Sequence, residues 1–317
     1  AFLLSQQLVD ALYNAKGISR FYTHQAQAIN NIHNGHNVIV ATQTSSGKSL
    51  IYQLPVLHAL QSDIETRAFY IFPTKALAHD QKRAFQEFIA YMPDLKHILI
   101  DTFDGDTPKT DRTRIRSNAS LIFTNPDMLH LSILPNHAHW HAFLRHLKFI
   151  VVDELHVYNG LFGSHVALVM RRLTRLAAAL GNTTIQFISC SATIANPTQH
   201  MKSLFGVDNI SLIDQDGSPS GRKEFICWNP PLLESSRRKS AIGEAAYLFI
   251  QLILNNIRSI AFCQVRTTCE ALTRTVREEL LALGKNDLLE RVASYRGGYT
   301  CHDRRKIEKE MFNGQLL

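Results

Sequence analysis

ATQTSSGKSL, residues 41–50, follows directly on the short run HNVIV of residues 36–40. A run of mostly β-branched, apolar residues predicts a buried strand. Residues 50–60 then place apolar side chains at helical spacing until Pro55, which is expected to interrupt the helix. A strand, a loop of small residues and a helix form the layout of a phosphate-binding loop, in which backbone N–H groups and the helix N-terminus face an anion.

Two side chains of this loop are suited to nucleotide chemistry. Lys48 would reach the β- and γ-phosphates, and the Ser49 hydroxyl would coordinate Mg²⁺. The residues expected to cradle the phosphates are Thr44, Ser45, Ser46, Gly47, Lys48 and Ser49. The usual pattern begins with glycine, whereas Thr42 stands at that position here. The stretch alone therefore leaves open a plain strand-to-helix turn with an exposed lysine.

Length and composition are those of a soluble globular protein with room for two domains. The chain has 317 residues, 45% of them hydrophobic, and a net charge of +7, which suits a polyanionic partner. No apolar run approaches a membrane span, and the first residues lack a basic leader and a cleavage site. We therefore expect no membrane partner and no signal peptide. The lack of an initiator Met predicts a piece of a longer protein.

Cysteines and histidines give no metal signature. The five cysteines form no C-x-x-C pair, which predicts reduced thiols in an intracellular protein. His137, His139 and His141 alternate, as metal ligands on a strand would. No acidic or cysteine partner lies at ligand spacing, so a solvated loop is favoured.

Apolar runs separated by helical patterns recur through the first two thirds of the chain. The predicted strands are 37–41, 67–72, 97–101, 120–124, 149–154 and 184–192, and helices are predicted at 75–92 and 163–180. This alternation predicts an α/β domain around a mainly parallel sheet. Polar motifs follow the strands directly, so they are expected to gather at one edge of that sheet.

The pattern changes after residue 213, where turn residues accumulate. We expect a first domain at 1–213, a connection at 214–240 that includes a short strand, and the start of a second α/β domain at 241–317. In that second part, a strand is predicted at 259–265 between helices at 245–256 and 267–284. Barely two strands are predicted after residue 213, which is too few to form a stable sheet.

FIVVDELH, residues 149–156, places two adjacent acids at the end of a predicted strand. Asp153 would hold Mg²⁺, and Glu154 would orient and deprotonate the water that attacks the γ-phosphate. Taken alone, the stretch is equally an acidic turn. Together with Lys48 and Ser49 at the same edge, it would complete a nucleotide site.

A third motif, FISCSATIANP, follows one predicted strand later, at residues 187–197. The hydroxyls of Ser191 and Thr193 are expected to bond to His156 of the preceding motif. Such bonds would couple the nucleotide site to the opposite surface of the protein.

Seven stretches occur in the order of the motifs of superfamily 2 helicases, and the chain is similar to that superfamily across nearly its whole length. They are RFYTHQAQAI, TQTSSGKS, FPTKALAHDQ, FDGDTP, TNPDML, VVDELH and SAT. The chain resembles the fungal RecQ-four-like helicases and the bacterial mitomycin repair factor in VVDELHVYNGLFGSHVALVMRRL, TNPDMLHLSILPN and YRGGYT. The resemblance implies a complete RecA-like domain, followed by the start of a second RecA-like domain.

The resemblance also implies roles for individual residues. Gln25 would bond the adenine edge and Tyr22 would stack on the base, although Gln25 also reads as a surface helix residue. The residues implied to contact a nucleic-acid strand are Thr74, Lys75, Gly105, Thr124, Arg266 and Arg296. Hydroxyls, backbone N–H groups and cations suit phosphates and carry no base code. Each of these residues also fits a helix cap, a turn or a solvated position.

Three departures from the family pattern bear on activity. The acidic motif reads DELH, with Leu155 at a packing position, and Ser45 replaces a common glycine. The motif with the arginine finger, which raises rates by about 10³–10⁵ in related NTPases, is not found before residue 317. We therefore expect this chain by itself to bind nucleotide but to hydrolyse it weakly or not at all.

The expected function is an ATP-dependent 3′→5′ DNA helicase or translocase of the nucleus that uses ATP and Mg²⁺. The 3′→5′ direction, the preference for DNA, the nuclear location, a place in DNA repair and a link to interstrand crosslinks are implied by the resemblance alone. Its expected partners are single-stranded DNA and DNA with a single-stranded tail. Because these motifs serve RNA and DNA alike, an RNA helicase remains an alternative. A nucleotide-gated clamp that binds nucleic acid without unwinding is the other.

Overall fold

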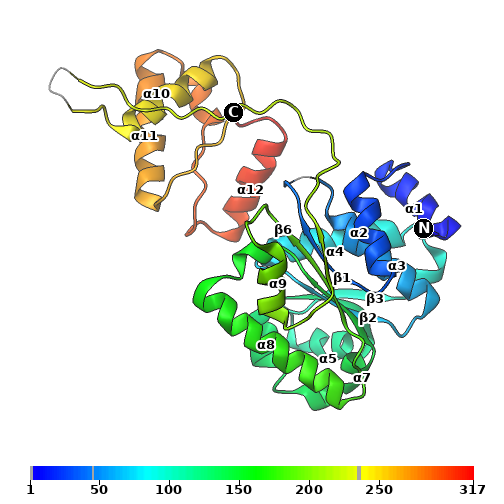
Figure 1. Cartoon of the computed structure of the whole chain (residues 1–317). Helices are drawn as coiled ribbons and strands as arrows, with labels where there is room; N and C mark the ends of the chain where they lie inside the picture. Colours follow the sequence, from blue (N-terminus) through cyan, green and yellow to red (C-terminus); the bar gives the residue numbers. More distant parts are fainter. Residues whose placement is uncertain (1–2, 45, 234–236) are drawn as a thin grey trace. The chain divides into compact units, whose positions relative to one another are not determined.

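A computed structural model describes residues 3–44, 46–233 and 237–317. The chain divides into two compact units, residues 1–221 and 222–317. Within the described residues, all seven strands belong to the first unit. Figure 1 shows the sheet that they form.

A single parallel sheet organises the first unit. Its strand order is β3-β4-β2-β5-β6-β1-β7, and every pairing is parallel. The strands are β1 (Asn37–Ala41), β2 (Arg67–Ile71), β3 (Leu99–Thr102), β4 (Ala119–Thr124), β5 (Leu147–Val152), β6 (Gln186–Ser191) and β7 (Ile210–Ile213). The predicted parallel α/β fold is confirmed, and no predicted strand end of this unit is shifted by more than two residues. The partly buried edge strand β7 was not predicted.

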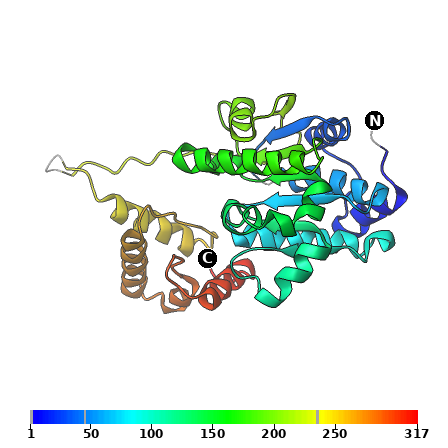
Figure 2. The ribbon, with the colours of Figure 1, turned by 90° about the horizontal axis from the view of Figure 1, so that it is seen from below.

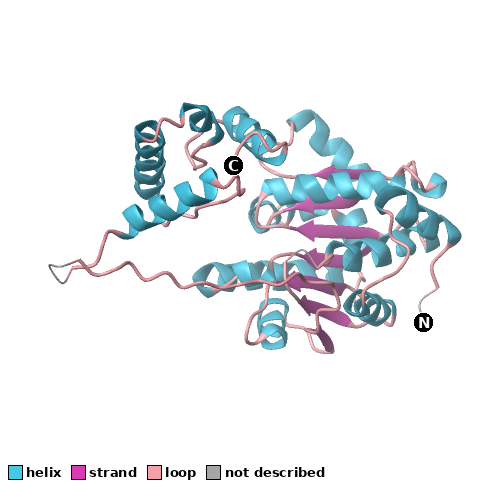
Figure 3. Ribbon diagram, turned by 90° about the horizontal axis from the view of Figure 1, so that it is seen from above, coloured by secondary structure: helices cyan, strands magenta, loops and turns pink. Residues whose placement is uncertain are grey.

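Helices cover both faces of the sheet (Figures 1 and 3). Because successive residues of a strand face opposite sides, Val38 and Val40 lie in one hydrophobic core and Ile39 in the other. The first core is closed by α1 (Gln6–Lys16), α2 (Thr23–His33), α3 (Ser49–Ser62) and α4 (Lys75–Ile89). The second is closed by α5 (Lys109–Asn118), α7 (His141–Arg145), α8 (Gly160–Ala179) and α9 (Pro197–Phe205), of which α8 is the long green helix of Figure 2.

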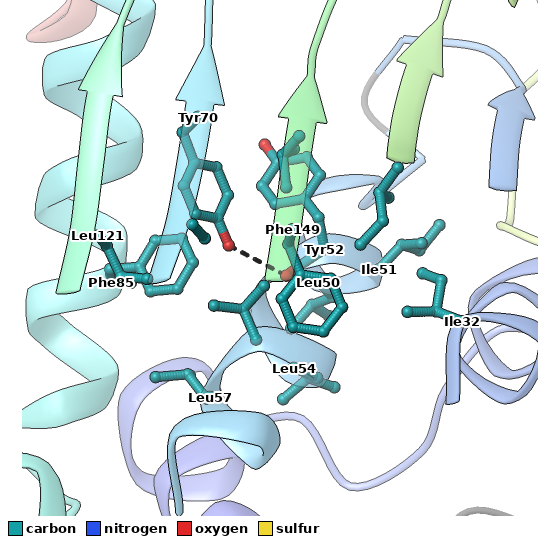
Figure 4. Packing of buried hydrophobic residues seen from close by; sticks show 14 of the residues in the cluster. Ile32, Leu50, Ile51, Tyr52, Leu54, Leu57, Tyr70, Phe85, Leu121 and Phe149 are labelled. Carbon is teal, nitrogen blue, oxygen red and sulfur yellow. Dashed lines mark hydrogen bonds between the residues drawn. The ribbon is translucent and has the colours of Figure 1, made fainter. Parts of the chain in front are cut away.

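Helix α3 runs through the first core, as Figure 4 shows. It continues to Ser62, so the prediction that Pro55 interrupts it is wrong. An internal proline costs about 3 kcal/mol, whereas each fully buried Leu or Val side chain contributes about 1.5–3 kcal/mol. Leu54, Val56 and Leu57 flank the proline and are fully buried, so their combined burial outweighs its cost.

The second unit is helical in its described residues. It contains α10 (Ala241–Leu254), α11 (Arg266–Ala282), η5 (Asn286–Arg291) and α12 (Cys301–Phe312). Its small core joins α10 and α11 through side chains such as Ile250 and Val276. The two predicted helices are present.

The strand predicted at 259–265 is absent. The short strand expected in the connection is also absent from its described residues, 214–233 and 237–240, where an isolated bridge joins Leu232 to Arg238. Ile260 and Phe262 are 62% and 94% exposed. A strand needs a partner for its N–H and C=O groups. Among the described residues of this unit no neighbouring strand supplies one.

The alternating histidines do not form a strand. His137–His139 is a short 3₁₀ helix, η3, and His141 begins α7. In the part of the chain that the structure describes, no group of three His, Cys, Asp or Glu side chains is placed to hold a metal ion. Over the same residues, no helix combines the length and the apolar character needed to cross a membrane.

Candidate nucleotide and nucleic-acid site

The phosphate loop (residues 42–49) connects β1 to α3. The buried hydroxyls of Thr42 and Ser46 are hydrogen-bonded at 2.8 Å. The Lys48 ammonium donates to Thr42 O at 3.0 Å and to Gln43 O at 2.6 Å, so it lies against the loop's own carbonyl groups. These contacts join the described residues on either side of position 45. Ser45 lies outside the described residues.

Helix α2 supports this loop from one side. Gln25 is 2% exposed, its Nε2 donates to Gly47 O at 3.0 Å, and its Oε1 accepts from Tyr22 N at 3.0 Å. Gly47 has a φ of +74°, and a Cβ there would lie 2.5 Å from Gln25 Nε2. Only glycine combines that backbone conformation with so close a neighbour. The amide predicted to read adenine therefore also holds the loop.

His24, the neighbour of Gln25, joins the loop to the end of the first unit. Gly217 N donates to His24 Nδ1 at 3.2 Å, and His24 Nε2 lies 3.0 Å from Ser46 O. Because Nδ1 accepts, the proton of a neutral imidazole is on Nε2, which donates to Ser46 O. The ring of Tyr22, 40% exposed, stacks on His24 with 5.9 Å between centroids.

Asp153 and Glu154 follow β5, two strands away from β1 in the sheet. Asp153 Oδ2 accepts from the Tyr52 hydroxyl at 3.3 Å, and Oδ1 accepts from Glu154 N at 2.9 Å. Burial, and then the Glu154 charge, raise the pKa of Asp153 to about 6. Tyr52 lies one turn after Ser49 on α3. The structure thus brings the Mg²⁺ ligands predicted by sequence to the same edge of the sheet.

The backbone at Glu154 is unusual, since its φ is +52°. Few residues other than glycine adopt this left-handed conformation, and such residues cluster at functional sites. The turn begins the short helix η4 (Leu155–Val157), which carries His156.

His156 connects the acidic motif to the segment after β6. Ala192 N donates to His156 Nδ1 at 3.2 Å. Glu154 Oε2 lies 3.4 Å from the same nitrogen, which cannot also donate to the carboxylate while it accepts from Ala192.

The predicted hydrogen bonds between the hydroxyls of Ser191 and Thr193 and the ring of His156 are not formed. Thr193 is exposed, and the buried Ser191 Oγ has no hydrogen-bond partner among the described residues. The SAT motif bonds to His156 through the backbone N–H of Ala192, because Ser191 is the last residue of β6.

Four residues of the first unit are predicted to contact a nucleic-acid strand, and three of them lie together near the start of α4. Thr74 caps α4 by accepting from Leu77 N, and the exposed Lys75 pairs with Asp106 at 2.6 Å. A Cβ at Gly105 would lie 3.8 Å from Lys75 Nζ. Thr124 differs: it is 2% exposed and donates to Phe103 O at 2.8 Å, so its hydroxyl shapes the loop from inside.

The two predicted arginines of the second unit are also neighbours. Arg296 pairs with Glu270 and lies over the Tyr299 ring, 4.7 Å from its centroid. Arg266, exposed at the start of α11, would be 3.0 Å from a Cβ at Gly297. Both guanidinium groups therefore lie beside the YRGGY loop.

The model of one protein family, described as DEAD/DEAH box helicase, matches residues 22–201, more than half of the chain. The match begins at Tyr22 and includes the phosphate loop and the acidic motif. The chain belongs to the DEAD/DEAH box helicase family. The predicted resemblance to superfamily 2 helicases is confirmed.

Curated relatives of this DEAD/DEAH box chain are longer proteins. It is 55% identical over 317 residues to the ATP-dependent helicase hrq1 of Schizosaccharomyces pombe, covering 99% of this chain and 30% of that protein. It is 56% identical over 313 residues to the ATP-dependent helicase HRQ1 of Saccharomyces cerevisiae, covering 98% of this chain and 29% of that protein. The chain thus spans less than a third of these relatives.

A solved helicase structure has the same fold. The DUF1998 helicase MrfA bound to DNA and AMPPNP matches 99% of this chain and 43% of that chain, with a TM-score of 0.91 and 40% identity. The predicted RecA-like fold of the sheet domain is confirmed.

Two residues of this helicase site were not predicted from the sequence. Tyr52 and His24 are a buried tyrosine and a buried histidine beside predicted site residues. The available signal was position: Tyr52 lies three residues after Ser49 on a helix, and His24 directly precedes Gln25.

Proposed function

We propose that this chain forms the ATP-binding core of an ATP-dependent DNA helicase. One observation carries the proposal: the Tyr52 hydroxyl on the helix of the phosphate loop lies 3.3 Å from the Asp153 carboxylate. This bond joins the two halves of a nucleotide site, and the names of the relatives, ATP-dependent helicases, agree with that role.

The residues present fit a divalent cation. Asp153 is buried, and the Lys48 ammonium is engaged with backbone carbonyls, so among the described residues no cation pairs with that carboxylate. A hydroxyl and a carboxylate are hard oxygen ligands of the kind Mg²⁺ prefers. Ser49 and Asp153 would hold the ion, which would neutralise phosphate charge when bound.

The other residues divide the work of ATP hydrolysis. Lys48 moves from its carbonyl contacts to the β- and γ-phosphates, and the N–H groups of the phosphate loop receive the phosphate oxygens. Tyr22 offers an exposed ring to the base, beside the amide of Gln25. Glu154 orients and deprotonates the attacking water. His156, bonded to Ala192 N, transmits the state of the site to the segment after β6.

Nucleic-acid contact is proposed at two places, described separately for the two units. Thr74, Lys75 and Gly105 grip the phosphate backbone in the first unit, and Thr124 supports their loop from below. Arg266 and Arg296 add contacts in the second unit. DNA as the substrate is supported by the match to MrfA, which was solved bound to DNA.

The wider role follows the same relatives. Residues 1–213 form the first RecA-like domain, 214–240 the connection and 241–317 the start of the second. A 3′→5′ direction of movement, a place in DNA repair, including repair of interstrand crosslinks, and a nuclear location complete the proposal.

The test is strand displacement by the full-length protein that carries this chain. Duplexes with a 3′ DNA tail, a 5′ DNA tail or a 3′ RNA tail are compared in the presence of Mg-ATP, with Lys48→Ala as the inactive control. We expect displacement from the 3′ DNA tail. Preference for the RNA tail would replace the proposal with an RNA helicase. ATP-dependent DNA binding without displacement would replace it with a clamp.

A further inference from the structure

A pocket lies at the opposite edge of the sheet from the nucleotide site. It has a volume of about 810 Å³ and is lined by the amino-terminal ends of β1, β5 and β6 and by the C-terminal parts of α2 and α3. This volume is within the range of small-molecule sites, roughly 300–1,000 Å³. The site proposed for ATP does not use it.

The pocket is lined by an excess of basic side chains. Arg145 and Lys148 lie on its wall, and within the described residues neither forms an ion pair with an acidic side chain. His33, His58 and His146 are also lining residues, whereas Asp63 is the one acidic residue of the lining. Such a set of charges favours an anion.

The pKa of His58 is affected by its position in the pocket and by the neighbouring basic groups. Partial burial, and then the charges of His33 and Lys148, lower the pKa of His58. Besides burial, the neighbouring positive charges of the lining therefore disfavour protonation of His58. A bound anion would offset these charges.

The walls of the pocket are already fixed. Asn182 Nδ2 donates to Leu144 O at 2.9 Å and to Leu147 O at 2.7 Å, and Gln186 Nε2 donates to Ile32 O at 2.8 Å. These bonds tie the starts of β5 and β6 to α2 and α7. A ligand would therefore meet a preformed site and would not have to order it.

We propose that this pocket binds a small phosphorylated anion. Several oxygens on one phosphorus atom can meet donors from different sides at once, and a guanidinium group matches them in pairs. Arg145 and Lys148 supply full charges, and the imidazoles of His33 and His58 line the same pocket. A single carboxylate ligand would leave some of these groups unused.

The test measures pyrophosphate binding by calorimetry to the 317-residue chain carrying Lys48→Ala, which disables the phosphate loop. We expect one site. Lys148→Glu and Arg145→Gln should each weaken it about tenfold or more, as expected for loss of a charged hydrogen bond. Lys96→Glu makes the same charge change at an exposed lysine outside the pocket and should leave the affinity unchanged.

A nuclear magnetic resonance titration gives an independent readout. Pyrophosphate should raise the pKa of His58 in the Lys48→Ala chain. The charged and titratable groups that line the pocket with His58 are His33, Asp63, Arg145, His146 and Lys148. Three outcomes would overturn the proposal: no pyrophosphate site in this chain, equal loss of affinity in Lys148→Glu and Lys96→Glu, or binding at this pocket of a single-stranded oligonucleotide but not of pyrophosphate.

Discussion

The hydroxyl of Tyr52 and the carboxylate of Asp153 are 3.3 Å apart, and the bond between them joins α3 to the end of β5. Tyr52 is 1% exposed, and the hydroxyl of Tyr70 donates to its backbone carbonyl at 3.2 Å (Figure 4). The tyrosine is therefore held in place from both ends. A group that contacts a metal ligand without contacting the metal acts by positioning it.

Tyr52→Phe should shift the pH dependence of nucleotide binding. The bond from Tyr52 favours the charged form of Asp153, so its loss should raise the pKa of that carboxyl above its present value of about 6. Mg-nucleotide binding needs the deprotonated carboxylate. As the pH falls, the variant should therefore lose binding at a higher pH than the parent chain does. Affinity for a fluorescent ATP analogue, measured across pH with Mg²⁺, tests this.

Tyr70→Phe is the matched control for that experiment. It removes a buried hydroxyl that bonds to the Tyr52 carbonyl but not to Asp153. Equal shifts of the pH profile in the two variants would show that Tyr52 acts only through packing.

The stability of the metal-free chain should fall as pH rises through about 6. Asp153 has a folded pKa raised to about 6 from 3.8, so its contribution is fully present below about 3.8 and is lost as pH rises through the folded value. The loss is on the order of 3 kcal/mol at most. Urea unfolding with a chelator at about pH 5 and about pH 8 measures the part of this loss that falls above pH 5, roughly half of it.

Asp153→Asn separates this contribution from the titration of other groups. The parent chain should lose more stability than the variant between the two pH values. An equal loss in both would mean that Asp153 carries no such cost. Added Mg²⁺ should restore stability to the parent chain only.

Lys48→Ala should weaken ATP binding by on the order of 10- to 100-fold, because the ammonium forms charged hydrogen bonds with phosphate oxygens. Binding of a fluorescent ATP analogue checks this. Lys75→Ala is the control, since Lys75 is exposed and pairs with Asp106 outside the phosphate loop. That variant should retain ATP affinity and lose affinity for single-stranded DNA. Normal ATP affinity in Lys48→Ala would refute the assignment of the loop.

Glu154→Gln should retain ATP and DNA binding and lower hydrolysis by about 10²–10⁴ in the full-length protein, because an amide cannot accept the proton of the attacking water. The amide keeps the shape of the side chain, which lies 3.4 Å from His156. Single-turnover hydrolysis and DNA binding are measured together. Hydrolysis at the parent rate would assign the base to another residue.

His24→Leu should destabilise the first unit and loosen the phosphate loop. It leaves the buried Ser46 O without its side-chain partner, at a cost of about 1–3 kcal/mol, and it also removes the acceptor of the N–H of Gly217, an exposed residue. Thermal unfolding and nucleotide affinity should both decline. Gln27→Leu, at an exposed position of the same helix, should change neither. An unaltered nucleotide affinity in His24→Leu would separate His24 from the loop.

Strong local patterns predicted the sheet domain well. The run from Asn37 to Ala41 is apolar and β-branched, and the structure has β1 over the same residues. The edge of the sheet that carries the candidate site was also predictable, because Lys48 and Asp153 follow strands whose direction is set by the parallel sheet. Local propensity agreed with the fold at these places.

Predictions failed where tertiary packing, and not the local sequence pattern, determines the structure. Pro55 lies inside a helix because the surrounding side chains are fully buried, and burial is not visible in a local pattern. Residues 259–265 have a strand-like sequence but no strand partner among the described residues. His24 and Tyr52 gain their roles from contacts 22 and 101 positions away in sequence, which spacing alone cannot show.

The contacts of the Lys48 ammonium with Thr42 O and Gln43 O make nucleotide binding an exchange. The lysine occupies internal acceptors before ATP arrives, and these must be given up when it turns toward the phosphates. The affinity of the loop is thus a difference between two sets of hydrogen bonds. Changes that weaken the internal set, even without touching ATP, would tighten nucleotide binding, and release of product would be assisted by the return of the lysine to its own backbone.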